Sequence, residues 1–237
     1  MKLTKISALC LAASTLFTAS SAMAWESGDH STSASVALGT DYMWRGASQS
    51  QNNAAISGSF DYAHASGFYA GTWASNVDFN SSASAEVDLY AGFGSEFGET
   101  GIGYDVSVLR YIYPTDATLN WNEYLASLSY SYFTVGIGYS ADVFNTEETG
   151  VYYSLGFDYD LPMDVALSAG VGYYDFNKAV WGAGNPDSAV DYHIGVSKEM
   201  AGFGFDLTYI DSDKDAGQLY GKSATDGRVV FTISKSM

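Results

Sequence analysis

Cysteine, proline and basic residues are scarce in this chain of 237 residues. Three prolines against 47% apolar residues exclude a disordered polypeptide. Ten basic residues stand against 27 acidic ones, and the net charge of −17 excludes a nucleic-acid-binding protein, which needs a basic face for the phosphates. Charged residues make up only 16% of the chain, where roughly 25% is usual. We therefore expect part of the protein surface to be in contact with something other than water.

The first 24 residues have the pattern of a cleaved secretory signal peptide. Lys2 and Lys5 precede a mostly apolar stretch, and Ala22-Met23-Ala24 supplies the small residues that signal peptidase requires. The single cysteine, Cys10, lies in this segment, so the mature chain has no disulfide. Its eight basic and 27 acidic residues give a net charge of −19. We expect a polar lead segment over 25–32 and one domain over 33–237.

No run of 18 apolar residues follows residue 25, which argues against a transmembrane helix. Apolar residues instead alternate with small or polar ones, and this period of two is typical of β-strands. Only the segment 68–76 is irregular, because Tyr69 and Trp73 fall on the opposite parity to Phe68. We predict twelve strands, near 34–44, 54–62, 68–76, 86–93, 102–108, 124–130, 135–139, 151–159, 165–173, 190–196, 203–209 and 229–233.

The connections between these segments are alternately short and long. Short ones fall near 65–67, 98–101, 132–134, 161–163 and 199–202, and long ones near 45–53, 79–85, 114–121, 142–149, 177–189 and 211–226. A Greek-key sandwich gives no reason for this regularity, whereas an outer-membrane barrel has short periplasmic turns and long outer loops. In hydrocarbon every backbone polar group must be paired, so a β structure spans a membrane only as a closed barrel.

The predicted fold class is therefore all-β, a transmembrane up-and-down antiparallel β-barrel of about twelve strands. The apolar parity is expected to face lipid and the polar parity to face inward. Aromatic residues gather near the predicted strand ends, where such barrels carry girdles at the two membrane interfaces. The expected girdle residues are Tyr42, Trp44, Tyr62, Tyr130, Tyr132, Tyr159, Tyr173 and Tyr209.

Several blocks of the sequence resemble the TorF-type porins of Gram-negative bacteria. GTDYMWRGASQS (39–50) and FDYAHASGFYAGTWASNVDF (60–79) carry most of the resemblance, with EVDLYAGF (86–93), YIYP (111–114) and NEY (122–124). The resemblance implies an outer-membrane porin and offers no catalytic residues or cofactor. It also implies the barrel assembly machinery as a partner, together with outer-membrane lipid and lipopolysaccharide. Met237 stands where such barrels commonly end in an aromatic residue.

The inward parity carries mostly small residues, and this scarcity of bulky side chains indicates a narrow open lumen. Its charges are mainly negative, which favours a cation-preferring diffusion channel for small solutes or cations. Two alternatives stay open: the acids pair with Arg, Lys or Tyr and plug the lumen, or the barrel is a closed structural or adhesive protein acting through its loops. The expected pore-lining acids are Asp41, Asp61, Glu86, Asp88, Asp105, Glu123, Asp158, Asp191 and Asp206, and the expected pore-lining bases are Arg45 and Arg228.

Enzymatic chemistry has little support in the sequence. The histidines of the mature chain are His30, His64 and His193, and no serine and acid can be placed with any of them as a triad. No hydrolase, zinc-protease or phosphate-binding motif is present.

Asp211, Asp213 and Asp215 have the spacing that begins an EF-hand calcium loop. Ala216 replaces the loop glycine and Lys222 replaces the bidentate glutamate, so the metal site is only a weak candidate. A solvated acidic loop is the simpler interpretation, and divalent ions bridging these acids to lipopolysaccharide phosphates are the other.

Overall fold

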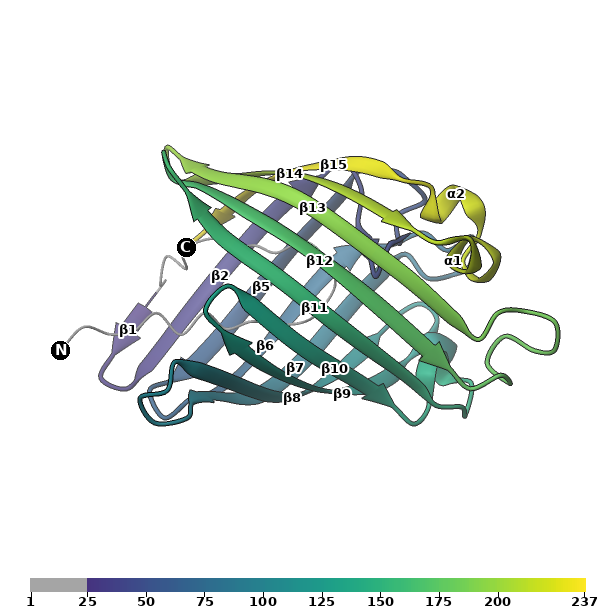
Figure 1. Ribbon diagram of the computed structural model, residues 1–237, viewed down its shortest axis with the longest axis horizontal. Helices are drawn as coiled ribbons and strands as arrows, with labels where there is room; N and C mark the ends of the chain where they lie inside the picture. Colours follow the sequence, from purple (N-terminus) through teal and green to yellow (C-terminus); the bar gives the residue numbers. More distant parts are fainter. Residues whose placement is uncertain (1–24) are drawn as a thin grey trace.

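The computed structural model of the protein describes residues 25–237, so the predicted signal peptide, 1–24, lies outside the described residues. Twelve antiparallel strands form one closed barrel (Figure 1), as the alternation predicts. The strands are β2 His30–Gly39, β5 Ala55–His64, β6 Phe68–Asn76, β7 Ala85–Glu96, β8 Ile102–Ile112, β9 Trp121–Tyr130, β10 Phe133–Ser140, β11 Gly150–Leu161, β12 Val165–Phe176, β13 Ser188–Met200, β14 Phe203–Ser212 and β15 Arg228–Ser236.

Each strand pairs with its neighbours in sequence, and β2 closes the ring. One edge of β2 pairs with β5, and the other pairs with β15 over Ser35–Gly39. Met237 extends the closing ladder through two backbone hydrogen bonds with Ala34, of 2.9 and 3.0 Å. The predicted lead segment is a small hairpin, in which β1 Trp25–Ser27 pairs with the first residues of β2. Closure leaves no long edge of the barrel strands unpaired, which is what a β structure needs in order to span a membrane.

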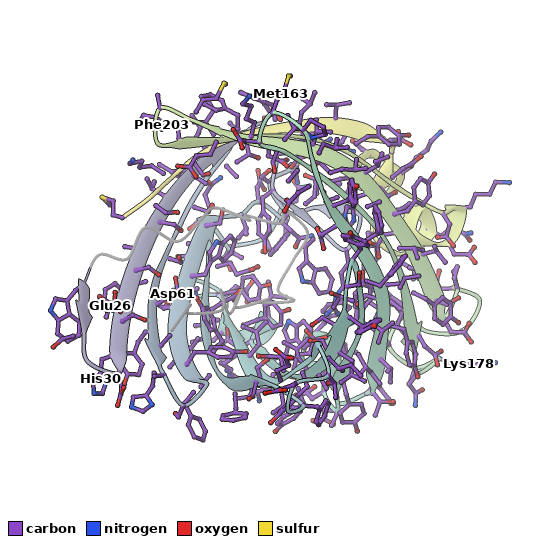
Figure 2. All side chains as sticks on the ribbon, turned by 60° about the vertical axis from the view of Figure 1, so that its left-hand side comes forward. Glu26, His30, Asp61, Met163, Lys178 and Phe203 are labelled. Carbon is purple, nitrogen blue, oxygen red and sulfur yellow. The ribbon has the colours of Figure 1, made fainter. Side chains whose placement is uncertain are left out.

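The two faces of the wall differ in chemistry, as period-two alternation requires. Large apolar side chains project outward from the strands: Ile56 is 60% exposed, Phe60 54% and Val135 50%. The alternate residues point into the barrel, Asp61 among them (Figure 2). None of the helices in residues 25–237 has the length and apolarity that a membrane crossing needs.

Six of the eight expected girdle residues lie on the outer face of the barrel. Tyr62, Tyr130, Tyr132, Tyr159, Tyr173 and Tyr209 lie on the outer parity of their strands or at their ends. The prediction is wrong for Tyr42 and Trp44, which are 7% and 6% exposed inside the barrel. The cause is that β2 ends at Gly39, so these two residues belong to the connection that follows and not to the strand.

The long connections carry the remaining elements, all at one end of the barrel. They are the β3 Met43–Trp44 and β4 Ala47–Ser48 hairpin, η1 Ala117–Leu119, η2 Val143–Asn145, α1 Lys214–Leu219 and α2 Lys222–Thr225. We call this end the long-loop half of the barrel and the other end the short-turn half. The main buried apolar cluster lies in the long-loop half and is rich in aromatic rings.

Candidate functional site

The connection between β2 and β5, which we call loop 40–54, folds into the barrel. Every residue from Asp41 to Ser48 is buried. The β3–β4 hairpin turns through Arg45 and Gly46, with φ of 45° and 77°. Two successive positive φ values are those of a type I′ turn, which matches the twist of a hairpin. A left-handed conformation costs a residue other than glycine roughly 1–2 kcal/mol, so contacts of the Arg45 side chain must offset that cost.

The base of loop 40–54 is held by one carboxylate. Asp41 Oδ1 accepts hydrogen bonds from the hydroxyls of Ser48 and Ser50, at 2.6 and 2.8 Å. Its Oδ2 accepts from Arg228 Nη1 of β15 at 2.9 Å. Asp41 therefore joins both sides of the hairpin to the neighbouring wall.

The tip of loop 40–54 docks on the far wall. Arg45 Nη2 donates to both carboxylate oxygens of Glu123, on β9, at 2.8 and 2.9 Å. Arg45 Cζ also lies 3.9 Å from the ring centre of Tyr152, on β11, and 4.8 Å from that of Tyr174, on β12. In the ring of strands β10 is farthest from β2, and β9 and β11 flank it. The loop therefore crosses the lumen from one side to the other.

Burial and the neighbouring charges shift the pKa of Arg45 in opposite directions. Burial alone lowers the pKa of the guanidinium, but the Glu123 carboxylate and nearby tyrosines raise it, so that the pKa lies above its usual value. Arg45 is thus a fixed cation inside the barrel. Removing one partner of a buried ion pair costs about 3–5 kcal/mol, because it leaves the other charge uncompensated.

Aromatic rings surround the tip of loop 40–54. Trp44 contacts four rings, with centroid distances of 5.9 Å to Phe144, 6.0 Å to Tyr174, 6.2 Å to Trp121 and 6.3 Å to Tyr111. Tyr111 and Trp121 stack on each other at 4.3 Å. These rings come from strands and connections around the far wall, so the tip sits in a packed aromatic layer. Nearer the base, Tyr42 packs against Trp73 of β6 at 5.1 Å.

Bulky side chains are common on the inner face, so the expectation that they are scarce is wrong. The small residues make room for neighbouring rings that lie across them. A Cβ added to Gly92 would come within 2.5 Å of Tyr69 Cζ, and one added to Gly172 would collide with the Tyr152 hydroxyl. The inward rings of Tyr69 and Trp73 also explain the irregular parity of 68–76.

Gly172→Ala is therefore expected to destabilise the barrel by about 1–3 kcal/mol, the usual cost of overpacking. The new methyl group would displace Tyr152 from Asp191 and Arg45. The matched control is Gly156→Ala, where the nearest atom to a Cβ is Thr134 O at 3.9 Å. Thermal unfolding followed by the heat-dependent gel shift measures both variants, and equal unfolding temperatures would contradict the steric explanation.

The nine predicted pore acids are found at two levels. In the long-loop half Asp41, Glu86, Asp88, Glu123 and Asp191 are all buried. In the short-turn half Asp61, Asp105, Asp158 and Asp206 are partly exposed. Both predicted bases, Arg45 and Arg228, belong to the long-loop half, and within residues 25–237 no other basic side chain lies on the inner parity of a strand.

Tyrosine hydroxyls are frequent partners of these acids. Glu86 Oε1 accepts from Tyr42 at 2.7 Å, and Asp105 accepts from Tyr69 at 2.9 Å. Asp61 accepts from Tyr90. The Oδ1 atom of Asp88 is buried without a hydrogen-bond partner among the described residues. A tyrosine hydroxyl carries no positive charge, so this pairing holds the acids in place without adding a compensating cation.

The three aspartates of the weak calcium motif do not converge. Asp211 accepts from the outward hydroxyls of Tyr192 and Tyr209, at 2.8 and 2.9 Å. Asp213 caps α1 by accepting from Ala216 N, and Asp215 accepts from Gln218 Nε2. Across the described part of the chain no three metal-binding side chains form a group.

The structure separates His193 from the other two histidines of residues 25–237. His30 and His64 are cross-strand partners on the outer face, with ring centres 5.0 Å apart. His193 is on the inner face, and a Cβ on Gly170 would lie 2.5 Å from its ring.

Sequence reasoning missed the aromatic residues that receive Arg45. The signal was present in the tyrosine pairs 152–153 and 173–174, which place one ring on each face of the wall. Of these four tyrosines, the predicted girdle includes only Tyr173, the outer member of the second pair. The sequence gives a weaker indication for Trp121, which lies two residues before Glu123 and therefore points to the same inner face of the strand.

Comparison with known proteins finds a sequence family and solved structures of similar fold. The sequence model of a family described as "Bacterial protein of unknown function (Gcw_chp)" matches residues 23–237. A search of curated proteins finds no match. The structure is similar to that of the KdgM porin, with a TM-score of 0.57 at 8% identity over 86% of this chain and 99% of the porin. A second KdgM structure, in complex with disordered oligogalacturonate, gives a TM-score of 0.55 at 9% identity over 86% and 99%. The likeness shows a shared barrel fold.

Proposed function

The chain belongs to the Gcw_chp family of bacterial proteins of unknown function, and we propose that it is an outer-membrane porin. In this proposal it forms a narrow, cation-preferring channel for passive diffusion of small solutes, and loop 40–54 is its constriction. The observation that carries the proposal is the closed barrel with an apolar outer face and an acidic inner face, crossed by loop 40–54. The resemblance to TorF-type porins supports it.

The outer face supports a location in the outer membrane. Exposed apolar side chains continue around the wall, and a monomeric soluble protein rarely carries an apolar surface of this extent. A β structure can expose such a surface to lipid only when it is closed, as this barrel is. The signal peptide expected over 1–24 would export the chain. Lipopolysaccharide and the barrel assembly machinery are the partners that such a location implies.

The inner charges support the preference for cations. Nine acids face two bases, and the four acids of the short-turn half have no inward base beside them. Fixed negative charge along a confined aqueous path lowers the free energy of cations and raises that of anions. The oligogalacturonate in the KdgM complex is a polyanion, and we expect this acidic lumen to exclude a solute of that kind.

A reversal potential measured under a KCl gradient tests the proposal. The refolded mature chain, shown by a heat-dependent gel shift to be a barrel, is inserted into a planar bilayer with tenfold different KCl concentrations on its two sides. We expect the reversal potential to have the sign of a channel that is more permeable to K⁺ than to Cl⁻. The opposite sign would overturn the preference for cations but would still show that the barrel is a channel.

A closed structural or adhesive barrel that acts through its loops is the second candidate. The observation that favours it is the packing of loop 40–54 across the lumen, where Glu123, Tyr111 and Met43 are no more than 2% exposed. The two candidates differ in a single readout. A closed barrel inserts without current at any voltage, whereas the channel conducts.

A further inference from the structure

The guanidinium of Arg45 occupies a cage that the barrel itself builds. Glu123 of β9 supplies the carboxylate, and Tyr152 of β11 and Tyr174 of β12 supply two rings. Tyr111 of β8 donates its hydroxyl to Glu123 Oε2 at 3.1 Å and so orients the carboxylate. All these groups belong to the wall. The cation belongs to loop 40–54.

The cage has the geometry that suits a planar cation. One nitrogen of Arg45 reaches both oxygens of Glu123, while Cζ lies 3.9 Å from the ring centre of Tyr152. Only Nη2 reaches the carboxylate, and Nη1 is buried without a hydrogen-bond partner among the described residues. Stacking on the ring therefore distinguishes a guanidinium here from an ammonium, which is a compact and strongly hydrated point charge.

Gly138 of β10 leaves the space that the carboxylate and the cation fill. A Cβ there would come within 2.7 Å of Glu123 Oε1 and 3.2 Å of Arg45 Nη2. The wall is thus shaped around both partners of the pair.

We propose that this cage is a binding site for guanidinium-type organic cations, with Arg45 as its resident internal ligand. A solute of that class competes with Arg45 for Glu123 and the tyrosine rings when loop 40–54 withdraws. Its binding weakens the hold of the loop on the far wall, so the solute promotes its own passage. This inference rests on the proposed channel function, because the solute reaches the cage through the lumen.

The direct test is a binding titration that needs no current. Methylguanidinium is added to the refolded Arg45→Ala barrel, and the fluorescence of Trp121, which stacks on Tyr111, is followed together with that of Trp44. We expect methylguanidinium to bind at least tenfold more tightly than methylammonium. We also expect the Arg45→Ala, Glu123→Gln double variant to lose this difference. Equal affinities for the two cations, or an undiminished difference in the double variant, would overturn the inference.

Wild-type protein provides a second measurement, which carries the test if Arg45→Ala yields no folded barrel. Methylguanidinium is expected to raise the wild-type conductance, because it displaces Arg45, and methylammonium at the same concentration is expected to leave it unchanged. The same response to both cations would contradict the site. Failure of the channel proposal looks different: no current appears under any condition, while the titration still reports binding.

Discussion

Replacement of Arg45 by alanine is expected to raise the single-channel conductance severalfold. Arg45 joins the tip of loop 40–54 to Glu123 at 2.8 Å and lies against the aromatic rings of Tyr152 and Tyr174 on the far wall. Its loss removes the only ion pair between the tip and that wall within the described residues. The remaining carboxylate is left buried without its cation, at a cost of about 3–5 kcal/mol to the docked state. The loop then spends more time away from the far wall, and planar-bilayer recording measures the larger current.

Two further variants separate this effect from a general loss of structure. Arg110→Ala removes an arginine on the outer parity of β8, which donates to Asn122 Oδ1 at 3.2 Å, and is expected to leave the conductance unchanged. Arg45→Glu combined with Glu123→Arg restores a pair of opposite charges and is expected to return the conductance toward the wild-type value. If Arg45→Ala and Arg110→Ala conducted equally, loop 40–54 would not be the constriction.

Neutralising the four predicted acids of the short-turn half is expected to weaken the preference for cations strongly. The variant combines Asp61→Asn, Asp105→Asn, Asp158→Asn and Asp206→Asn, which remove four negative charges from the half that has no inward base. With these carboxylates gone, a potassium ion in that half of the lumen loses most of its electrostatic advantage over chloride. The reversal potential under a KCl gradient should move toward zero.

The matched control removes the same total charge outside the lumen. Glu99→Gln, Glu147→Gln, Asp164→Asn and Asp175→Asn alter exposed acids in connections or on the outer parity. This control is expected to keep the wild-type reversal potential. A shift as large in the control as in the lumen variant would show that net charge, and not the inner wall, sets the selectivity.

The barrel could be predicted from the sequence because its determinants are local. Residues such as Val135 and Ile137 reveal a lipid-type face through spacing alone, and the alternating lengths of the connections indicate an up-and-down order. The same parity predicts which strand residues point into the barrel. These features depend on neighbours in sequence, so a single chain contains the information.

Loop 40–54 could not be predicted because its contacts are long-range. Arg45 and Glu123 are 78 residues apart in sequence, and no periodicity relates them. The inward turn begins after Gly39, yet Tyr42 and Trp44 continue the apolar parity of the strand before it and so imitate a longer strand. The inward glycines led to the wrong prediction of an inner face with few bulky side chains. Their small size makes room for a neighbouring ring such as that of Tyr69, and the residue pattern alone does not show where that ring lies.

Substituted-cysteine block of the channel tests the central claim most directly, because the chain beyond residue 24 contains no cysteine. Ser127→Cys places a thiol on the inner parity of β9, and Leu128→Cys places one on the outer face, where the native leucine is 47% exposed. A charged methanethiosulfonate reagent is expected to reduce the unitary current of Ser127→Cys and to leave that of Leu128→Cys unchanged. Full labelling of Ser127→Cys with no change in current, or heat-shifted barrels that carry no current at all, would contradict a conducting path through the lumen.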